Sequence, residues 1–401
     1  MRICMVSSLY PPETIGGAEK YVKNVSESLV DDGHEVYVLT TGCGIGVGEG
    51  TEKVNGVTVR RISPTGFYTP YESRDAPFWQ KPPQQVLERW NPSAFMEIKE
   101  FYRETNPDIV HTHNFGGLST AAFTAASYCR LPVVHTLHDY RLLDIRYTLW
   151  HNEENVGVRR LMAPYRWFNR RIVDRPVDRV LSPSRFMLEI HQEYGFFTNV
   201  DSTCIPYGMS YSDATNVHSN KGETDSEDRL RLLFVGQLTA QKGVLWLAKS
   251  ITDMRQSDIQ LDILGKGPHR DELEQLAKQD ERIAVHGFVT GEELDQFYRQ
   301  ADATVVPSKW YDNSPVVIYE SYFQGTPVIG ADIGGIPELI QEGQTGFLFD
   351  PYDSASLRAA IRSAIQADDE QLEAGVERVR EQYTMEKHIP KLVSEYESTL
   401  A

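Results

Sequence analysis

The sequence predicts an α/β protein built from two Rossmann-like domains with parallel sheets. The chain has 401 residues, more than one ordinary hydrophobic core takes up, so its length favours two domains. Apolar runs alternate with amphipathic stretches along the whole chain, which is the pattern of parallel strands covered by helices. An opening plan of strand, glycine-containing loop and helix occurs at the N-terminus and again after residue 228. Two such domains imply a cleft, and we expect them to face each other across it.

The first half supplies the elements of the first domain in order. A strand at RICMVSSL leads through a Pro/Gly loop into a helix at AEKYVKNVSESLVDDGH, and EVYVLTT forms the next strand. The period of this helix predicts a buried stripe, made of Tyr21, Val22, Val25, Leu29 and Val30. Further strands are expected at VTVRRI, DIVHTH, PVVHTL and RVLSPS, with a helix at STAAFTAASYCR.

The boundary between the domains is indicated by a change in composition. Residues 212–228 are polar, carry no large apolar side chain apart from one valine, and are predicted as a linker or loop. This places the first domain at 1–211 and the second at 229–385. The second domain starts with RLLFVGQL and continues with strands at LDILG, IAVHGF, ATVVPS and TPVIGA. We expect a last helix at 386–401, whose course can bring it back onto the first domain.

Charge and composition narrow the class of protein. The formal net charge of −17 argues against nucleic acid as a partner, because most of the surface would repel a phosphate backbone. No apolar run reaches the roughly 18 residues that span a bilayer, and the N-terminus MRICMVSSLY matches a signal peptide poorly. We therefore expect a cytoplasmic protein. Its four cysteines lie far apart and are interpreted as reduced, buried thiols: Cys4, Cys43, Cys129 and Cys204.

The segment PSKWYDNSPVVIYESYFQGTPVIG, residues 307–330, is the most informative part of the chain. Asn313 and Ser314 are good helix caps, and Pro315 suits the first helical position. A helix is therefore expected to begin at this point, with its first backbone amides free of intrahelical partners.

The start of this helix is a candidate phosphate site. The unpaired amides of Val316 and Val317 would point outward, where a helix N-terminus attracts an anion. Asp312 lies just ahead of the helix, and Glu320 lies more than one turn inside it, where it can accept hydrogen bonds from ribose hydroxyls. The alternative interpretation is that both carboxylates are ordinary surface groups.

Two glycine-containing turns offer further contacts to a diphosphate. In FVGQLTAQKG, Gly236 follows a strand, and the flexible ammonium of Lys242 can reach a phosphate. In the first domain, Gly16 and Gly17 lie between a strand and a helix, so the backbone there can approach a diphosphate closely. Neither turn is the GxGxxG fingerprint of a dinucleotide site, which disfavours a nicotinamide-dependent enzyme. Lys242 could also be a solvated loop lysine.

Together these segments resemble the GT-B glycosyltransferases of family GT4, also called glycosyl transferases group 1. The resemblance covers nearly the whole chain and implies a GT-B fold. It implies that Asp312 faces the donor sugar and that Glu320 holds the nucleotide ribose. The family usually has Glu where this chain has Asp312, which is one methylene shorter.

The resemblance assigns further residues around the nucleotide. Gly236, Gln237 and Lys242 match the phosphate clamp of the family, which commonly has Arg where this chain has Gln237. LGKGP, with Gly267, and HGFV, with Phe288, match landmarks near the base. IGGIPEL, with two glycines after a strand, matches the place where the family turns toward the donor; these are Gly334 and Gly335.

Histidines gather at two successive strand ends of the first domain, where ligand sites of open α/β sheets lie. His138, followed by Asp139, resembles the family position whose His faces the transferred sugar or the acceptor. His111 and His113 are interpreted as buried structural histidines, while His135 completes the cluster. Zinc is not expected, because strand alternation points neighbouring side chains to opposite faces.

The chain is expected to work without a metal ion or any other cofactor. No two aspartates are separated by a single residue, so the metal-binding DxD of the other main glycosyltransferase class is absent. Charge on the leaving diphosphate would be neutralised by Lys242, Gln237, the Gly16 and Gly17 amides and the helix start near Val316. By resemblance the reaction retains the anomeric configuration.

Two segments of the first domain concern the acceptor. Residues 158–179 hold seven arginines with aromatic residues among them, which is typical of a helix that contacts anionic lipid or a phosphate-bearing acceptor. The alternative is an ordinary helix whose arginines pair with Asp174 and Asp178, its period broken by Pro164. The aromatic, proline-rich stretch 67–92 is either an acceptor-binding lid or a loop packed on the domain.

The sequence therefore predicts a retaining hexosyl- or related glycosyltransferase of polysaccharide or glycolipid biosynthesis. The expected donor is a nucleotide diphosphate sugar, a UDP- or GDP-sugar first, and the acceptor a glycan, a glycolipid or a lipid-linked sugar. The enzyme would lie in the cytoplasm, with peripheral contact to the inner face of the cell membrane through 158–179. The alternative is a noncatalytic partner of another transferase that binds a nucleotide sugar without turnover.

Overall fold

The computed structural model describes residues 1–13, 16–42, 49–70, 72, 76–210, 229–254 and 258–401. The chain forms two compact units. Unit 1 comprises Met1–Thr148, Val158–Gly208 and Met385–Ala401, and unit 2 comprises Leu149–Gly157 and Met209–Thr384. The linker expected at 212–228 lies outside the described residues.

Unit 1 is built around an eight-stranded sheet in the order β10-β9-β6-β5-β1-β2-β4-β3. Its strands are β1 Arg2–Val6, β2 Glu35–Thr41, β3 Gly50–Val54, β4 Val57–Ile62, β5 Ile109–Thr112, β6 Val133–Thr136, β9 Arg179–Ser182 and β10 Asp201–Cys204. β1 pairs in parallel with β2 on one side and β5 on the other. The central strands are apolar and buried, as expected of strands covered on both faces.

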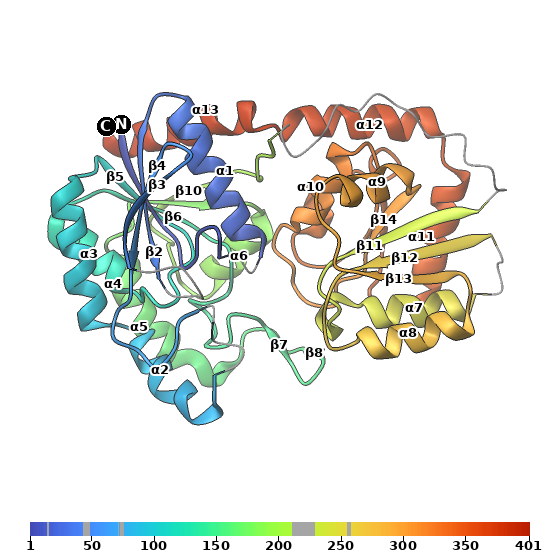
Figure 1. Ribbon diagram of the computed structural model, residues 1–401, viewed down its shortest axis with the longest axis horizontal. Helices are drawn as coiled ribbons and strands as arrows, with labels where there is room; N and C mark the ends of the chain where they lie inside the picture. Colours follow the sequence, from blue (N-terminus) through green and yellow to red (C-terminus); the bar gives the residue numbers. More distant parts are fainter. Residues whose placement is uncertain (14–15, 43–48, 71, 73–75, 211–228, 255–257) are drawn as a thin grey trace. The chain divides into compact units, whose positions relative to one another are not determined.

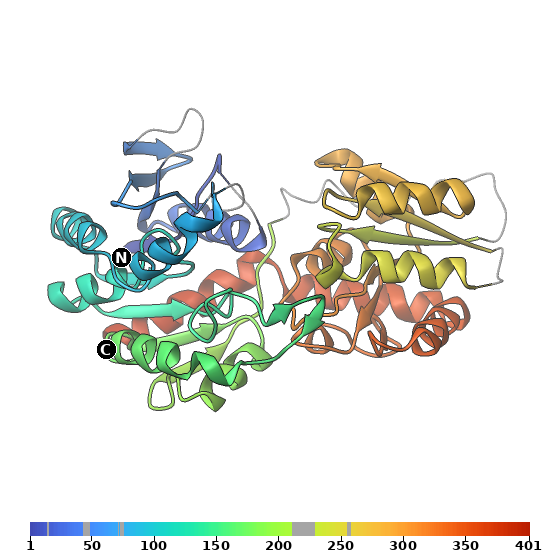
Figure 2. The same cartoon turned by 90° about the horizontal axis from the view of Figure 1, so that it is seen from below.

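Helices cover this sheet (Figures 1 and 2). They are α1 Gly17–Asp31, η2 Phe78–Gln80, α2 Lys81–Leu87, α3 Pro92–Thr105, α4 Ala121–Cys129, η3 Arg160–Met162, α5 Ala163–Val173, α6 Arg185–Glu193 and α13 Met385–Leu400. Capping residues fix the ends of several of these helices. The Asn91 side chain caps α3 by accepting from the Ser93 and Ala94 amides, and α3 ends at Asn106 in the left-handed conformation.

Unit 2 holds a six-stranded parallel sheet in the order β13-β12-β11-β14-β15-β16. Its strands are β11 Leu230–Val235, β12 Ile259–Leu264, β13 Ile283–Gly287, β14 Ala303–Val306, β15 Val328–Ala331 and β16 Gly346–Phe349, with the short pair β7 Trp150–His151 and β8 Glu154–Asn155. Its helices are η5 Ala240–Lys242, α7 Val244–Thr252, α8 Arg270–Gln279, α9 Glu292–Gln300, α10 Val316–Phe323, η6 Ile336–Glu338, α11 Ser354–Gln366 and α12 Asp369–Gln382. Figure 1 shows α7 and α8 on one side of this sheet and α9 and α10 on the other.

The α/β class and the two Rossmann-like sheets are confirmed. Five strands of the described chain were not predicted from the sequence, namely β3, β10, β16 and the short pair β7 and β8. One of them, β3, pairs antiparallel with β4 at the edge of the otherwise parallel sheet. In α1, four of the five expected stripe residues are buried, whereas Val30 is only partly buried. Val30 lies at the margin of the stripe, where its side chain faces Gly56.

The last helix belongs to the core of unit 1. The Tyr21 hydroxyl on α1 is 2.9 Å from His388 Nε2 on α13, and His111 Nδ1 on β5 is 2.6 Å from the Tyr396 hydroxyl, also on α13. His388 and Tyr396 are both buried. The C-terminal segment therefore completes the interior of the unit that the N-terminal residues begin.

Two remaining expectations concern the cysteines and the membrane. Cys4 is buried, but Cys129 is partly exposed and Cys204 exposed, so the expectation of buried thiols was wrong for Cys204, which ends the edge strand β10. Cys43 lies outside the described residues. In the part of the chain that the structure describes, no helix has the length and apolar character needed to cross a bilayer.

Candidate functional site

The charged centre of unit 2 is an ion pair between Lys242 and Asp312. Lys242 Nζ lies 2.5 Å from Asp312 Oδ2, and the Ser308 hydroxyl donates a hydrogen bond of 2.9 Å to the same oxygen. Lys242 comes from the turn after β11 and Asp312 from the loop after β14, two strands that are neighbours in the sheet. The Asp312 side chain is 9% exposed, so its charge is held mainly by these two partners.

Glycines hold the two turns that carry this pair. Gly243, which follows Lys242, has φ +70°, and a Cβ there would lie 1.9 Å from the Pro307 carbonyl oxygen. Gly334 has φ +63°, and its Cβ would lie 2.4 Å from the Asp312 carbonyl oxygen. Gly335 donates its N–H to that carbonyl at 2.8 Å. Only glycine fits Gly243 and Gly334, because both a left-handed backbone and a close backbone contact are required.

Helix α10 begins at Val316, next to this ion pair in sequence, and Pro315 takes the N-cap position. The expectation that Pro315 is the first helical residue was therefore wrong by one position. Asn313 and Ser314 do not cap the helix, and the Ser314 hydroxyl instead lies 2.6 Å from the Tyr319 hydroxyl. Among the described residues, no acceptor is found for the Val316 and Val317 amides, as expected of a helix N-terminus.

Glu320 lies inside α10, as expected. It is partly exposed, and the hydroxyl of the buried Tyr298 on α9 donates a hydrogen bond of 3.1 Å to Glu320 Oε2. This contact orients the carboxylate from one side.

The other expected donor residues lie in loops at the ends of β11, β12 and β13. Gly236 follows β11, and the next residue, Gln237, is partly exposed. Gly267 packs on the Leu238 backbone so closely that a Cβ would lie 2.4 Å from its carbonyl oxygen. Phe288, after β13, is 62% exposed, and Lys266 Nζ lies 4.3 Å from its ring centroid. Neighbouring strand ends of one parallel sheet therefore carry all of these groups.

His138 in unit 1 has both ring nitrogens engaged. Nδ1 lies 2.7 Å from the Tyr207 hydroxyl, and Nε2 lies 3.0 Å from His113 Nδ1. Burial lowers the pKa of His138 to about 3, so the ring is neutral at physiological pH. A neutral imidazole bonded on both sides has a fixed orientation.

The other histidines of this cluster are buried, as expected of His111 and His113. Burial holds the pKa of both well below the usual range, and their rings lie 4.0 Å apart. His135 faces the other side of the sheet, where it contacts Thr112 and Phe123. Among the described residues, no three His, Cys, Asp or Glu side chains are grouped so that they could hold a metal ion.

Gly16 and Gly17 lie at the start of α1, where Gly16 is the N-cap residue. The Gly16 amide donates to Glu19 Oε2 at 2.8 Å, and Glu19 is buried. A carboxylate of this chain therefore already occupies one of the amides that we expected to meet a diphosphate.

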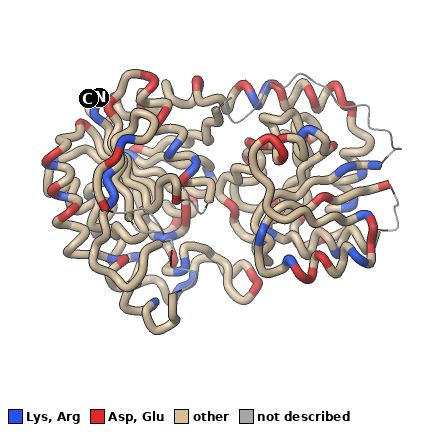
Figure 3. Tube along the Cα trace, in the orientation of Figure 1, with Lys and Arg blue, Asp and Glu red and all other residues tan. Residues whose placement is uncertain are grey.

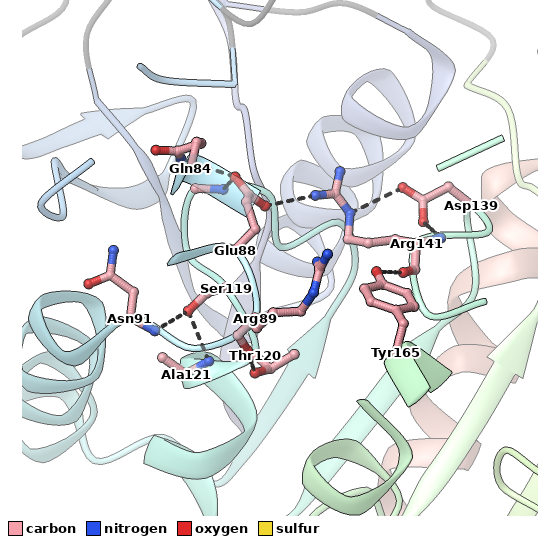
Figure 4. A network of polar contacts seen from close by, with 11 residues as sticks. Gln84, Glu88, Arg89, Asn91, Ser119, Thr120, Ala121, Asp139, Arg141 and Tyr165 are labelled. Carbon is pink, nitrogen blue, oxygen red and sulfur yellow. Dashed lines mark hydrogen bonds and ion pairs between the residues drawn. The ribbon is translucent and has the colours of Figure 1, made fainter. Parts of the chain in front are cut away.

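Sequence reasoning missed a polar network in unit 1, centred on Arg141 and Glu88 (Figure 4). Arg141 Nη1 donates to Glu88 Oε2 at 3.1 Å, and the Arg141 amide donates to Asp139 Oδ1 at 2.8 Å. Glu88 also accepts the Gly117 amide at 3.0 Å. The order HDYR, with an arginine three residues after His138, could have indicated this network, but its partner 53 residues away could not be read from spacing.

Two neighbours of the expected residues were also missed. Ser308 is a hydroxyl four residues ahead of Asp312, inside the segment that carried the prediction. Tyr207, which holds His138, lies next to Gly208, where the second segment of unit 1 ends. No sequence pattern paired Tyr207 with a histidine 69 residues away.

Comparison with known proteins agrees with the two Rossmann-like units. The family model described as Glycosyltransferase Family 4 matches residues 15–211, and the model described as Glycosyl transferases group 1 matches residues 229–367. An uncharacterized glycosyltransferase of Methanocaldococcus jannaschii is 26% identical over 364 residues, which covers 89% of this chain and 87% of that protein.

Solved structures share the fold over nearly the whole length. Sucrose-phosphate synthase from Thermosynechococcus elongatus aligns with a TM-score of 0.75 at 21% identity, covering 99% of this chain and 98% of that one. Anabaena HepE in complex with UDP aligns with a TM-score of 0.71 at 16% identity, covering 99% and 100%. HepE was also solved with UDP-glucose.

The fold is that of a GT-B glycosyltransferase. Within that class, the chain belongs to the group 1 glycosyl transferases, with an N-terminal half of glycosyltransferase family 4.

Proposed function

We propose that this glycosyltransferase moves a sugar from a nucleotide diphosphate sugar to its acceptor with retention of configuration and without a metal ion. The observation that carries the proposal is the Lys242–Asp312 pair beside the free N-terminus of α10. A cation and a helix N-terminus can together neutralise a diphosphate, which is the task a metal ion has in other transferases. A UDP- or GDP-sugar is the proposed donor, and the UDP and UDP-glucose complexes of HepE support UDP first.

Donor binding would change the partner of Lys242. In the structure its charge is compensated by Asp312 at 2.5 Å. A diphosphate bound at the Val316 and Val317 amides brings negative charge that competes for the ammonium. Asp312 would then turn from the lysine to the sugar, while Glu320 accepts hydrogen bonds from the ribose hydroxyls.

The proposed reaction exchanges one bond at the anomeric carbon. The bond from this carbon to the phosphate oxygen breaks, and the acceptor oxygen attacks from the same face. The acceptor proton passes to the departing phosphate oxygen, so the products are the glycosylated acceptor and the nucleoside diphosphate. Lys242 and the α10 amides stabilise the charge that grows on the leaving group. His138 contacts the transferred sugar or the acceptor as a neutral ring.

The acceptor is proposed to be a glycan, a glycolipid or a lipid-linked sugar, reached at the inner face of the cell membrane through residues 158–179. Two arginines of this segment are structural, since Arg159 pairs with Asp144 and Arg179 with Glu395. Arg170 acts electrostatically on Asp174, one of the two acids weighed from sequence. The exposed arginines with no such partner among the residues the structure describes are Arg160, Arg171 and Arg175. These three support contact with anionic lipid.

Thermal unfolding with UDP, GDP, ADP and their sugar conjugates, in EDTA, tests the donor site. A ligand at a hundredfold excess over its Kd stabilises a protein by about 2.7 kcal/mol. We expect one nucleotide to raise the melting temperature of wild type, and Lys242→Ala and Glu320→Ala to lose that rise. Lys249→Ala is the matched control, because Lys249 lies on α7 of the same unit in an exposed pair with Glu272.

The outcomes separate the alternatives. If no nucleotide stabilises wild type, the donor site is assigned wrongly. If a nucleotide sugar binds in EDTA but is neither transferred nor hydrolysed in the presence of membrane extracts and glycans, the protein is a noncatalytic partner. Transfer that requires added Mg²⁺ or Mn²⁺ would contradict metal independence.

A further inference from the structure

Unit 1 carries an apolar pocket of about 440 Å³ between α2 and α5. The lining is mostly apolar, with one charged residue, Arg89, and one side-chain amide, Gln85. The apolar and aromatic residues are Pro82, Val86, Trp90, Ile145, Tyr165 and Phe168. The pocket joins the two segments whose aromatic residues stood out in the sequence, 67–92 and 158–179. Neither segment alone has the walls of a binding site.

The walls of the pocket are open to solvent. Val86 is 69% exposed, Phe168 is 39% exposed, and Trp90 is also exposed. Large apolar side chains gathered in this way on a surface mark a binding site for an apolar partner. A sugar chain would need several converging hydrogen-bonding groups, and the lining has few.

The charge on the pocket is positive, and no ion pair with a described residue compensates it. The Arg89 guanidinium lies 4.0 Å above the Tyr165 ring and forms no ion pair with any residue that the structure describes. Its neighbour Arg141 differs, since Glu88 and Asp139 compensate it. In a chain with a net charge of −17, whose carboxylates are spread over both units in Figure 3, a lone arginine beside an apolar pocket matches an anionic group attached to a hydrocarbon.

The pocket is linked to the strand ends that carry His138 through a chain of hydrogen bonds. The Tyr165 hydroxyl, in the pocket wall, donates to the Arg141 carbonyl oxygen, and Arg141 binds Asp139, which follows His138 in the chain (Figure 4). Glu88, one residue from Arg89, accepts the amide of Gly117 in the loop after β5. Hydrogen bonds thus link the residues that line the pocket to the loops after β5 and β6.

We propose that this pocket binds the hydrocarbon chain of a phosphate-bearing lipid acceptor and that Arg89 binds its phosphate. The proposal rests on the proposed function and narrows its acceptor to an amphiphile. The apolar walls select the chain, the arginine selects the anionic head, and the network through Tyr165 and Arg141 fixes both relative to His138.

Calorimetric titration with dodecyl phosphate below its critical micelle concentration tests the pocket. We expect wild type to bind, Val86→Asp to weaken binding at least tenfold, and Arg89→Gln to weaken it severalfold. Leu161→Asp is the matched control, because Leu161 is an aliphatic residue of the adjacent η3, 84% exposed, that does not line the pocket. Its affinity should stay within twofold of wild type. Both aspartates replace exposed side chains, and equal melting temperatures verify that the variants fold.

Three results would overturn the proposal. If Val86→Asp and Leu161→Asp lose affinity equally, both for dodecyl phosphate and for vesicles of phosphatidylglycerol, the surface binds a bilayer and not a single lipid. Equal affinity for inorganic phosphate and dodecyl phosphate would leave only an anion site. If Val86→Asp binds dodecyl phosphate as tightly as wild type does, the pocket is not the binding site. Nucleotide stabilisation in the same samples separates the two proposals, because loss of the donor site leaves dodecyl phosphate binding intact.

Discussion

The two units place polar groups at the same position, the carboxyl ends of parallel strands, but hold them in opposite ways. In unit 2 a lysine and an aspartate remain charged and neutralise each other at 2.5 Å. In unit 1 burial keeps the imidazoles neutral, and hydroxyl groups and other rings satisfy them. Under the proposed function, the ion pair of unit 2 would meet the charged diphosphate, and the neutral imidazoles of unit 1 would meet sugar hydroxyl groups, apart from the anionic head proposed to bind at Arg89.

The largest expected effect concerns the charge of Asp312 in unit 2. Asp312→Asn keeps the shape of the side chain but removes its charge, so we expect the transfer rate to fall about a hundredfold, the scale of losing one preorganised electrostatic group. Asp312→Glu should stay within about tenfold of wild type, because the family usually has Glu here. Steady-state kinetics with the donor identified by thermal unfolding measures both. If Asp312→Asn is as active as wild type, the charge of Asp312 has no role in the reaction.

The backbone support of Asp312 can be tested separately from its charge. Gly334→Ala places a Cβ against the Asp312 carbonyl, whereas Gly343→Ala has a similar φ of +71° and no atom within 4 Å. Both should lose about 1 to 3 kcal/mol of unfolding free energy from the left-handed backbone. Only Gly334→Ala should also lose about tenfold in transfer rate. Equal kinetic losses in the two variants would show that the close contact is irrelevant to the site.

Acidification should destabilise unit 1 more than unit 2. Among the histidines that the structure describes, burial lowers the pKa of six, and all six lie in unit 1: His111, His113, His135, His138, His191 and His388. Their folded pKa lies below the ordinary value of about 6.5, so their neutral forms stabilise unit 1 above that pH, and this stability is lost as the pH falls from 6.5 toward 4. Hydrogen exchange at pH 7 and pH 5 should therefore show unit 1 losing protection before unit 2. The reverse order would contradict the neutral network.

The smallest expected effect concerns the hydroxyl that holds His138. Tyr207→Phe removes the hydrogen bond of 2.7 Å to His138, whose loss costs about 0.5 to 1.5 kcal/mol. We expect kcat to fall roughly threefold with the donor KM unchanged, because the donor groups lie in unit 2. Tyr128→Phe, at an exposed tyrosine of α4, is the control and should leave kcat unchanged. A rise in donor KM in Tyr207→Phe would place Tyr207 against the donor instead.

The elements that the sequence predicted well are those that periodicity alone determines. EVYVLTT and VTVRRI match β2 and β4 residue for residue, because both are strand-forming runs with buried apolar positions. β3 was missed because GTEKV is exposed, or nearly so, along its whole length and exists through its pairing with β4. Hydrophobic patterning contains no information about an edge strand of this kind.

The candidate site was predicted in its parts but not in its contacts. A helix start, a lysine after a strand and two carboxylates could be recognised in short segments. That Lys242 and Asp312 form an ion pair across 70 residues follows from the neighbouring positions of β11 and β14, which the chain order does not give. The arginines of residues 158–179 show the same limit. Arg159 pairs with Asp144, which precedes the segment, and not with Asp174 or Asp178 inside it.

The position of α13 has a consequence for how the protein is made. Because His388 and Tyr396 fill the interior of unit 1, the nascent chain cannot close that interior before α13 has been synthesised and has left the ribosome. The N-terminal half is therefore completed only after the whole of unit 2 has been made, and a premature stop codon anywhere ahead of α13 would damage the N-terminal half of the product.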